Sequence, residues 1–205
     1  MEYMNLGDLF NFLLRDYTVC NFDITGILGC YLNGLYILHN KLNIIHGDLT
    51  PMNILVTYMG STYRQKIICD DKEYYINTNG YKYNISDFGL AEYIEEDDIN
   101  NTYINHIYRD YLLLFFLYFN KTIFYNYNMF GSIIELCVEQ IKDNLFESYG
   151  ITDKYKKYFL ENNNFTSVCN FMDQYLEIDY NDALFYDIPK ILLKEFIELT
   201  VIDKK

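Results

Sequence analysis

The sequence predicts an α+β fold that is mainly helical and carries a small β patch near its middle. Apolar residues recur at helical spacing between residues 23 and 40. Short segments rich in β-branched and aromatic residues follow between residues 54 and 85, and helical patterning resumes from residue 108. With 205 residues, 51% of them hydrophobic, the chain is long enough for one sizeable core. We therefore expect a single domain.

The first half of the chain contains two expected helices, an extended segment and four expected strands. The helices cover residues 8–14 and 23–40, and Ile44-Ile45 begins the extended segment. The expected strands are Ile54–Val56, Lys66–Cys69, Glu73–Ile76 and Tyr81–Ile85. Asp70-Asp71-Lys72 joins the second and third of them as a hairpin, and Asn79-Gly80 is a strong tight-turn signal before the fourth.

The sequence of the second half predicts an exposed acidic loop at residues 92–105, followed only by helices. The expected helices are 108–119, 132–143, 152–161, 166–176 and 189–202. Pro189 fits the first turn of the last one, because that position needs no backbone N–H.

Charge and composition exclude several classes of function. A net charge of −13 argues against nucleic acid as a partner, since phosphate binding needs a basic face. The longest apolar run, residues 111–119, is too short to span a membrane, which takes roughly 20 residues. No N-terminal signal is visible, and five scattered cysteines without a Cys-x-x-Cys pair favour a reduced compartment, so we expect a cytoplasmic protein.

Three polar residues in two short motifs point to phosphoryl transfer. Asp48 follows an extended segment, where a carboxylate can orient an acceptor hydroxyl and take its proton. Asn53 lies five residues further on, and Asp87 begins Asp-Phe-Gly after the last strand. An amide oxygen and a carboxylate in these places suit a Mg²⁺ ion held on a nucleoside triphosphate.

The pattern His-x-Asp-x-x-x-x-Asn followed by Asp-Phe-Gly resembles the C-terminal lobe of protein kinases. The resemblance covers nearly the whole chain and implies one kinase-like C-lobe over residues 1–205. Within it, residues 1–9 resemble the hinge, 46–53 the catalytic loop and 87–89 the Asp-Phe-Gly motif, while 108–202 form the helical remainder. The hinge match is short, and a loose N-terminal segment is the alternative interpretation.

This resemblance implies a role for each site residue, with ATP and Mg²⁺ as cofactors. Asp48 would be the catalytic base, and Asn53 and Asp87 the metal ligands. The backbone of Glu2 and Met4 would pair with adenine, Asp8 would accept from the ribose hydroxyls, and Leu55 would pack under the adenine ring.

Three further residues match structural positions of the same family. His46 and Phe88 fall where two rings stack behind the site. Asp110 resembles the buried aspartate that holds the backbone of the catalytic loop, although a simple helix N-cap is the alternative interpretation.

The departures from the family pattern concern regulation and the elements that bind the phosphates of the nucleotide. Gly47 replaces the arginine that would bind a phosphorylated activation loop, and Thr50 replaces the lysine typical of serine/threonine kinases. No Gly-rich loop or strand lysine precedes the hinge-like segment, so we expect a separately encoded N-terminal lobe or self-association. The long hairpin before Asp-Phe-Gly is similar to divergent kinases of poxviruses and other large DNA viruses, which would place the protein in host cytoplasm or the virion.

The sequence leaves three hypotheses open. The first is a serine/threonine protein kinase, or its catalytic half, that phosphorylates a protein substrate. The second is a catalytically inactive kinase-like lobe that acts as a decoy or scaffold. The third is a small-molecule kinase of the aminoglycoside type.

Overall fold

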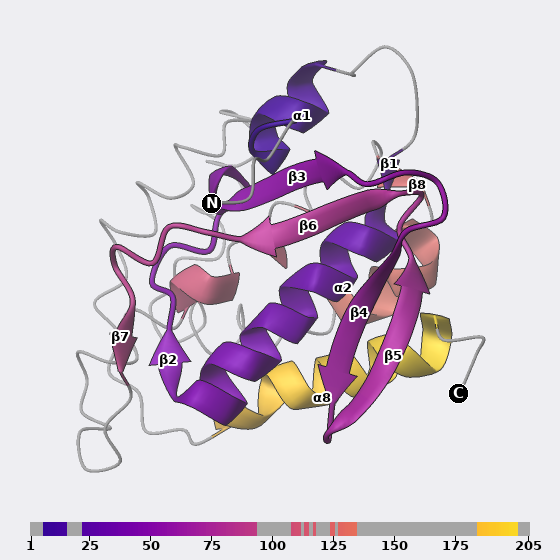
Figure 1. Ribbon diagram of the computed structural model, residues 1–205. Helices are drawn as coiled ribbons and strands as arrows, with labels where there is room; N and C mark the ends of the chain where they lie inside the picture. Colours follow the sequence, from indigo (N-terminus) through magenta and orange to yellow (C-terminus); the bar gives the residue numbers. More distant parts are fainter. Residues whose placement is uncertain are drawn as a thin grey trace, which may run out of the picture.

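A computed structural model describes residues 6–15, 22–93, 108–111, 113–114, 117, 124–125, 127–134 and 184–200. Helix α2 (Ile24–Leu35) runs through the middle of this part of the chain (Figure 1). Strands β3 (Ile54–Tyr58) and β6 (Tyr81–Ile85) lie along one side of α2. The hairpin of β4 (Arg64–Cys69) and β5 (Lys72–Asn77) lies beside it, over α8 (Leu184–Thr200).

The two expected N-terminal helices are confirmed, and each begins after an aspartate. Asp8 precedes α1 (Leu9–Arg15) and accepts from the Asn11 backbone N–H at 2.8 Å. Asp23 caps α2 by accepting from the Thr25 N–H at 2.9 Å. Both carboxylates satisfy N–H groups that have no partner inside the helix. Helix α2 then continues as a π-helical turn, Tyr36–Lys41, which the periodicity did not distinguish from α-helix.

Antiparallel pairing of β3 and β6 aligns the two sequence motifs. The register runs from Ile54 opposite Ile85 to Tyr58 opposite Tyr81. Residue 53 therefore lies beside residue 86 at one end of the pair. At the other end, Asn79 and Gly80 both have positive φ, 54° and 88°, as the expected tight turn requires.

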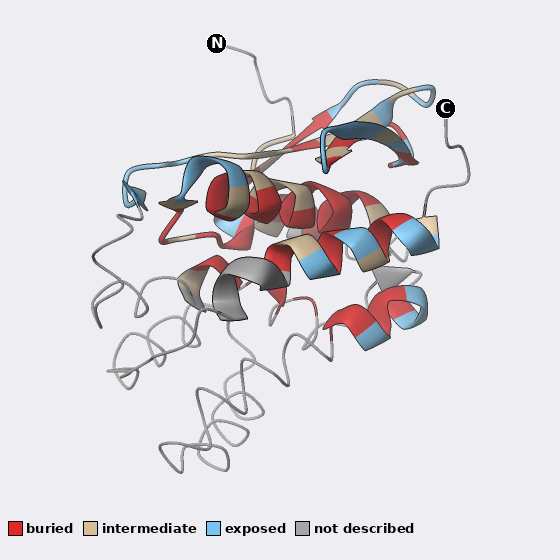
Figure 2. Cartoon of the chain, turned by 90° about the horizontal axis from the view of Figure 1, so that it is seen from below, coloured by how far each residue is buried: buried red, intermediate tan, exposed pale blue. Residues whose placement is uncertain are grey.

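The expected hairpin is also confirmed, and it is longer than predicted. Its turn is Asp70-Asp71, whose φ values of 47° and 61° match the turn type that fits the twist of a two-residue hairpin. Glycines of α2 let the hairpin approach closely: a Cβ on Gly29 would lie 2.5 Å from the Ile76 side chain and 2.9 Å from Phe196 of α8. Buried residues gather along these facing surfaces (Figure 2).

Residues 92–105 were predicted as a loop, and the structure corrects the start of this range. Glu92–Tyr93 forms strand β7, which pairs antiparallel with β2 (Ile44–Ile45), with Ile45 opposite Glu92. Both residues of β7 are exposed, so this strand has no alternation of buried apolar and exposed polar residues from which the sequence could predict it. Residues 94–105 lie outside the described part.

The helical second half is described only in part. Tyr108–Tyr111 forms a 3₁₀ turn rather than the expected α-helix, while residues 113, 114, 117 and 127–134 are helical. Phe124–Tyr125 forms β8, which pairs in parallel with β1 (Phe22–Asp23). The predicted helices 152–161 and 166–176 fall outside the described residues.

The last helix starts earlier than predicted. Helix α8 begins at Leu184, so Pro189 lies inside it rather than in its first turn. Pro189 has no N–H to donate to the carbonyl of residue 185, so α8 lacks one backbone hydrogen bond at this point. Among the described helices, none is long and apolar enough to cross a membrane.

Candidate active site

The segment between β2 and β3 brings Asp48 and Asn53 into direct contact. The Asn53 side-chain amide donates to the Asp48 backbone oxygen at 2.8 Å and to its carboxylate Oδ2 at 2.9 Å. The turn that allows this is Pro51–Asn53, a 3₁₀ helix in which the Asn53 N–H bonds to the Thr50 carbonyl at 3.0 Å. Because the amide nitrogen is engaged, the Asn53 amide oxygen is the atom left to face a cation.

Asp87 lies at the same end of the β3–β6 pair. Its neighbour Ser86 donates twice to the Asn53 carbonyl, from the backbone N–H at 2.9 Å and from the hydroxyl at 3.1 Å. Asp87 itself is exposed and has φ 61°, a strained conformation for a residue with a side chain. The Gly89 N–H donates to Asp87 Oδ1 at 3.3 Å. The structure therefore brings Asp48, Asn53 and Asp87 together, as the sequence predicted.

His46 connects the catalytic loop to the Asp-Phe-Gly motif. Its Nε2 lies 2.9 Å from the Ser86 carbonyl, and its Nδ1 accepts from the Asp48 N–H at 3.3 Å. A carbonyl only accepts, so the contact with Ser86 assigns a proton to Nε2. The predicted stacking with Phe88 is confirmed, with ring centroids 4.8 Å apart.

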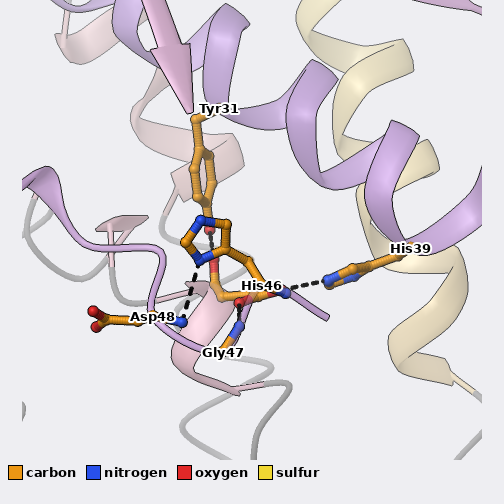
Figure 3. A network of polar contacts seen from close by, with 6 residues as sticks. Tyr31, His39, His46, Gly47 and Asp48 are labelled. Carbon is orange, nitrogen blue, oxygen red and sulfur yellow. Dashed lines mark hydrogen bonds and ion pairs between the residues drawn. The ribbon is translucent and has the colours of Figure 1, made fainter. Parts of the chain in front are cut away.

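The carboxylate of Asp110 holds the backbone of the catalytic loop through hydrogen bonds. This carboxylate is fully buried and accepts from the backbone N–H groups of His46 at 2.8 Å and Gly47 at 2.7 Å. Figure 3 shows His46 and Gly47 with Tyr31 and His39 nearby. His39 Nε2 donates to the same carboxylate at 2.7 Å, and the Tyr31 hydroxyl donates to the Asp110 carbonyl at 2.6 Å. The interpretation of Asp110 as a simple N-cap is wrong, because its partners are distant in sequence.

The electrostatic environment sets the protonation of Asp48. Burial raises the pKa of its carboxyl above the usual aspartate value, and the negative charge of Asp87 adds to this. The hydrogen bond from Asn53 and the positive charge of Arg109 oppose the rise. Asp48 is therefore a stronger base than an exposed aspartate.

The residues expected at the nucleotide base are only partly described. Asp8 and Leu55 form an isolated antiparallel β-bridge, and the Val56 N–H donates to the Gly7 carbonyl at 2.8 Å, so Asp8 and Leu55 are neighbours. Both Asp8 carboxylate oxygens already accept from Asn11, at 2.8 and 2.7 Å. Glu2 and Met4 lie outside the described residues.

The donor set suits a magnesium ion that is shared with phosphates. The described residues contain no group of three or more His, Cys, Asp or Glu side chains that could cage a metal. Mg²⁺ bound to a nucleotide needs only one or two protein oxygen ligands, because phosphates and water complete its shell. The Asn53 amide oxygen and the exposed Asp87 carboxylate meet that need.

Sequence reasoning missed His39, Ser86 and Tyr31. His39 and Tyr31 come from α2 and its π-helical turn, and they reach Asp110 from 71 and 79 positions away in sequence. No local pattern shows such a contact. Ser86 could have been noticed, because it directly precedes Asp87 at the end of an expected strand.

Two acidic side chains and an amide gather at one end of the β3–β6 pair, an arrangement that suits phosphoryl transfer. The family described as "Protein kinase domain" matches residues 1–110, more than half of this chain. The chain therefore belongs to the protein kinase family.

Several curated relatives are protein kinases of eukaryotes. The mitogen-activated protein kinase kinase SIPKK of Nicotiana tabacum is 38% identical over 60 residues, which cover 29% of this chain and 17% of that protein. The mitosis inhibitor protein kinase SWE1 of Candida albicans is 44% identical over 62 residues, 29% of this chain and 5% of that protein. The dual specificity mitogen-activated protein kinase kinase 1 of Dictyostelium discoideum is 38% identical over 60 residues, 29% of this chain and 9% of that protein. The chain thus matches less than a fifth of each relative's length.

Proposed function

We propose that this chain forms the C-terminal lobe of an ATP-dependent serine/threonine protein kinase and supplies its catalytic groups. Asp48 acts as the base, and Asn53 and Asp87 hold Mg²⁺. The observation that supports this most directly is the double link at Asn53. Its side chain binds Asp48, and its backbone carbonyl accepts from Ser86, next to Asp87.

Each residue has one chemical task in this proposal. Asp48 accepts the hydrogen bond of the substrate hydroxyl and orients its oxygen for attack on the γ-phosphorus of ATP. It receives the hydroxyl proton as the new O–P bond forms and the bond to the departing ADP breaks. Its raised pKa makes it a better acceptor for that proton. Asn53 and Asp87 would hold Mg²⁺ in a fixed place relative to Asp48, and the ion would supply positive charge to the phosphates. Asp110 holds the loop in the geometry that these tasks need.

The surroundings of Gly47 support a site that is not switched by a phosphorylated activation loop. A Cβ at Gly47 would lie 2.7 Å from the Leu90 carbonyl oxygen, and Gly47 has φ 78°. The position is therefore strained for an arginine and has no room for one without a backbone shift.

Phosphoryl transfer to protein tests the assignment of Asp48. We expect Asp48→Asn to abolish transfer from labelled Mg-ATP to casein and histone while nucleotide affinity changes little, because the base acts on the acceptor hydroxyl. Asp71→Asn is the control, since Asp71 is an exposed acid in the turn of the β4–β5 hairpin. Equal transfer rates for Asp48→Asn and its parent would rule out Asp48 as the base.

The assay should be run on the chain alone and on the chain joined behind the N-terminal lobe of a protein kinase. Transfer only by the joined protein supports the catalytic proposal, with the remaining phosphate contacts coming from the other lobe. Tight Mg-ATP binding without any transfer, even when joined, supports the scaffold instead.

Nucleotide binding by the chain alone should be weak and depend on Mg²⁺. Asp8 and Leu55 provide one side of a base and ribose site, and we propose that Glu2 and Met4 provide the adenine contacts. Calorimetry with Mg-ATP measures this directly. Affinity that Asp87→Ala leaves unchanged would contradict the proposed metal site.

An exposed apolar surface beside the acidic residues is consistent with a covering lobe or self-association. Phe88 is 50% exposed, Leu90 57% and Met52 44%, all within or next to the two motifs. Such a surface commonly marks an interface. We propose that a kinase N-terminal lobe, on this chain or another, covers it.

A further inference from the structure

The β4–β5 hairpin has one edge covered and one edge open. On the β4 side, α2 and its π-helical turn accept hydrogen bonds from the outward backbone: the Ile68 N–H donates to Asn33 Oδ1 at 2.7 Å, and the Asp70 N–H donates to the Tyr36 hydroxyl at 3.2 Å. Strand β5 lies on the far side of β4 from α2 (Figure 1). Nothing in the described part of the chain pairs with its outer edge.

The register identifies which backbone groups of β5 face outward. A two-residue turn places Cys69 and Lys72 in the first hydrogen-bonded pair, and bonded pairs then alternate along the strands. Ile68 confirms the alternation, because its N–H points away from β5 toward α2. Its partner Glu73 therefore points its own N–H and carbonyl outward, and so do Tyr75 and Asn77. These three residues are exposed.

A cavity of about 420 Å³ lies directly inside this open edge, between the hairpin and α8. Its walls include Lys72 and Tyr74 of β5, and Ile197 and Glu198 of α8. The side chains of Lys72 and Tyr74 lie on the opposite face of the hairpin from those of Glu73 and Tyr75. A strand added to β5 would place every second side chain over this cavity. Its size is within the range of ligand pockets.

The charges at the cavity favour an acidic group near the turn. The Asp70 carboxylate forms ion pairs with two ammonium groups, that of Lys190 at 3.2 Å and that of Lys194 at 2.8 Å. Lys72, in the cavity wall, makes no ion pair among the described residues. Glu198 is the second carboxylate at the cavity, so Lys72, Lys190 and Lys194 exceed the two carboxylates by one positive charge, while Tyr74 and Ile197 supply apolar surface.

We propose that β5 accepts an extended segment of a partner protein as a third strand of the hairpin. The segment carries a carboxylate and an apolar side chain two residues apart. The carboxylate pairs with Lys72 and Lys194, and the apolar side chain packs on Tyr74 and Ile197. This docking site is separate from the candidate active site and does not depend on its chemistry.

Labelled peptides of roughly eight residues, the length of a strand, test the proposal against the full chain. The test peptide is rich in Thr and Val and carries Asp and Leu two positions apart. The control peptide has the same composition with Asp and Leu adjacent, so the two side chains point to opposite faces. We expect about tenfold tighter binding of the test peptide by fluorescence anisotropy. Equal binding of the two peptides, or no saturable binding of either, would overturn the proposal.

Two variants separate backbone pairing from side-chain contact. Tyr75→Pro removes an outward N–H while leaving the bonds to β4, so it should abolish peptide binding. Tyr75→Ala keeps the N–H and should bind within about threefold of the parent. Equal affinities for these two variants would show that the edge is not the site.

A charge reversal gives an independent readout if the proline variant does not fold. Lys72→Glu should reverse the preference, so that a peptide with Lys in place of Asp binds more tightly. Unchanged preference refutes the role of Lys72. Sedimentation velocity tests the alternative occupant, which is a second copy of this chain. If the parent chain dimerises and Tyr75→Pro is monomeric, the edge binds a second copy and no partner segment.

Discussion

Replacing Asp110 tests whether one buried carboxylate holds the catalytic loop in place. Asp110→Asn keeps the shape of the side chain but replaces one acceptor oxygen with an NH₂ group. In the native structure the two oxygens accept from three donors: the His46 N–H, the Gly47 N–H and His39 Nε2. The variant leaves at least one of these buried donors facing another donor.

The cost follows from the burial of this network. Asp110 and His39 are both fully buried, so water cannot replace a lost partner. A buried donor without an acceptor costs about 1–3 kcal/mol, and hydrogen bonds to a charged group contribute about 1.5–3 kcal/mol. We expect Asp110→Asn to lower the free energy of unfolding by about 2–4 kcal/mol. That is a large share of the roughly 5–15 kcal/mol typical of a domain.

Urea unfolding and amide exchange together measure this effect. The unfolding midpoint should fall, and exchange at the His46 and Gly47 amides should accelerate before global unfolding. Asp71→Asn is the matched control, because Asp71 is 90% exposed and pairs only with Lys41 among the described residues, and such an exposed ion pair contributes little to stability. A loss below about 1 kcal/mol in Asp110→Asn, with unchanged exchange at both amides, would refute the reasoning.

Two further predictions concern protonation and backbone strain. Asp87→Asn should lower the pKa of Asp48, measured by carbon NMR titration, since the charge of Asp87 raises it. Because the native state binds this proton more tightly than the unfolded chain, the contribution of Asp48 to stability should fall as pH rises through its pKa, whereas activity should rise. Gly47→Ala should cost about 1–3 kcal/mol more than Gly7→Ala in urea unfolding. The two glycines have φ 78° and 80°, but only at Gly47 would a Cβ meet backbone, the Leu90 oxygen at 2.7 Å. Equal costs would contradict the close contact.

Local signals in the sequence were sufficient for much of the fold. The apolar period of residues 24–35 predicted α2, and a two-residue polar turn between apolar segments predicted the β4–β5 hairpin. The Asn79-Gly80 turn fixed the start of β6, and through it the end at which Asp87 emerges. The convergence of Asp48, Asn53 and Asp87 was predicted from the resemblance of their two motifs to those of protein kinases, and the β3–β6 pairing shows how it is achieved.

Contacts between segments far apart in sequence were not predictable. The β2–β7 pair consists of two short strands, and β7 shows no alternation because both its residues are exposed. The early start of α8 contradicts the usual place of proline in a helix. The packing of the hairpin and of α8 on α2 depends on Gly29, which resembles any helical glycine until the structure shows what approaches it.

Helix α2 and its π-helical turn link the hairpin to the catalytic loop. Asn33 and Tyr36 bind the backbone of the hairpin, while Tyr31 and His39 bind Asp110. One continuous helical element therefore holds both the candidate docking edge and the loop that carries Asp48. The hairpin leaves β3 after Tyr58 and returns to β6 at Tyr81, so it extends the far end of the same strand pair whose near end carries Asn53 and Asp87. A partner bound at β5 would lie on an element fixed to the site by packing rather than on a free loop, so its position relative to Asp48 is defined.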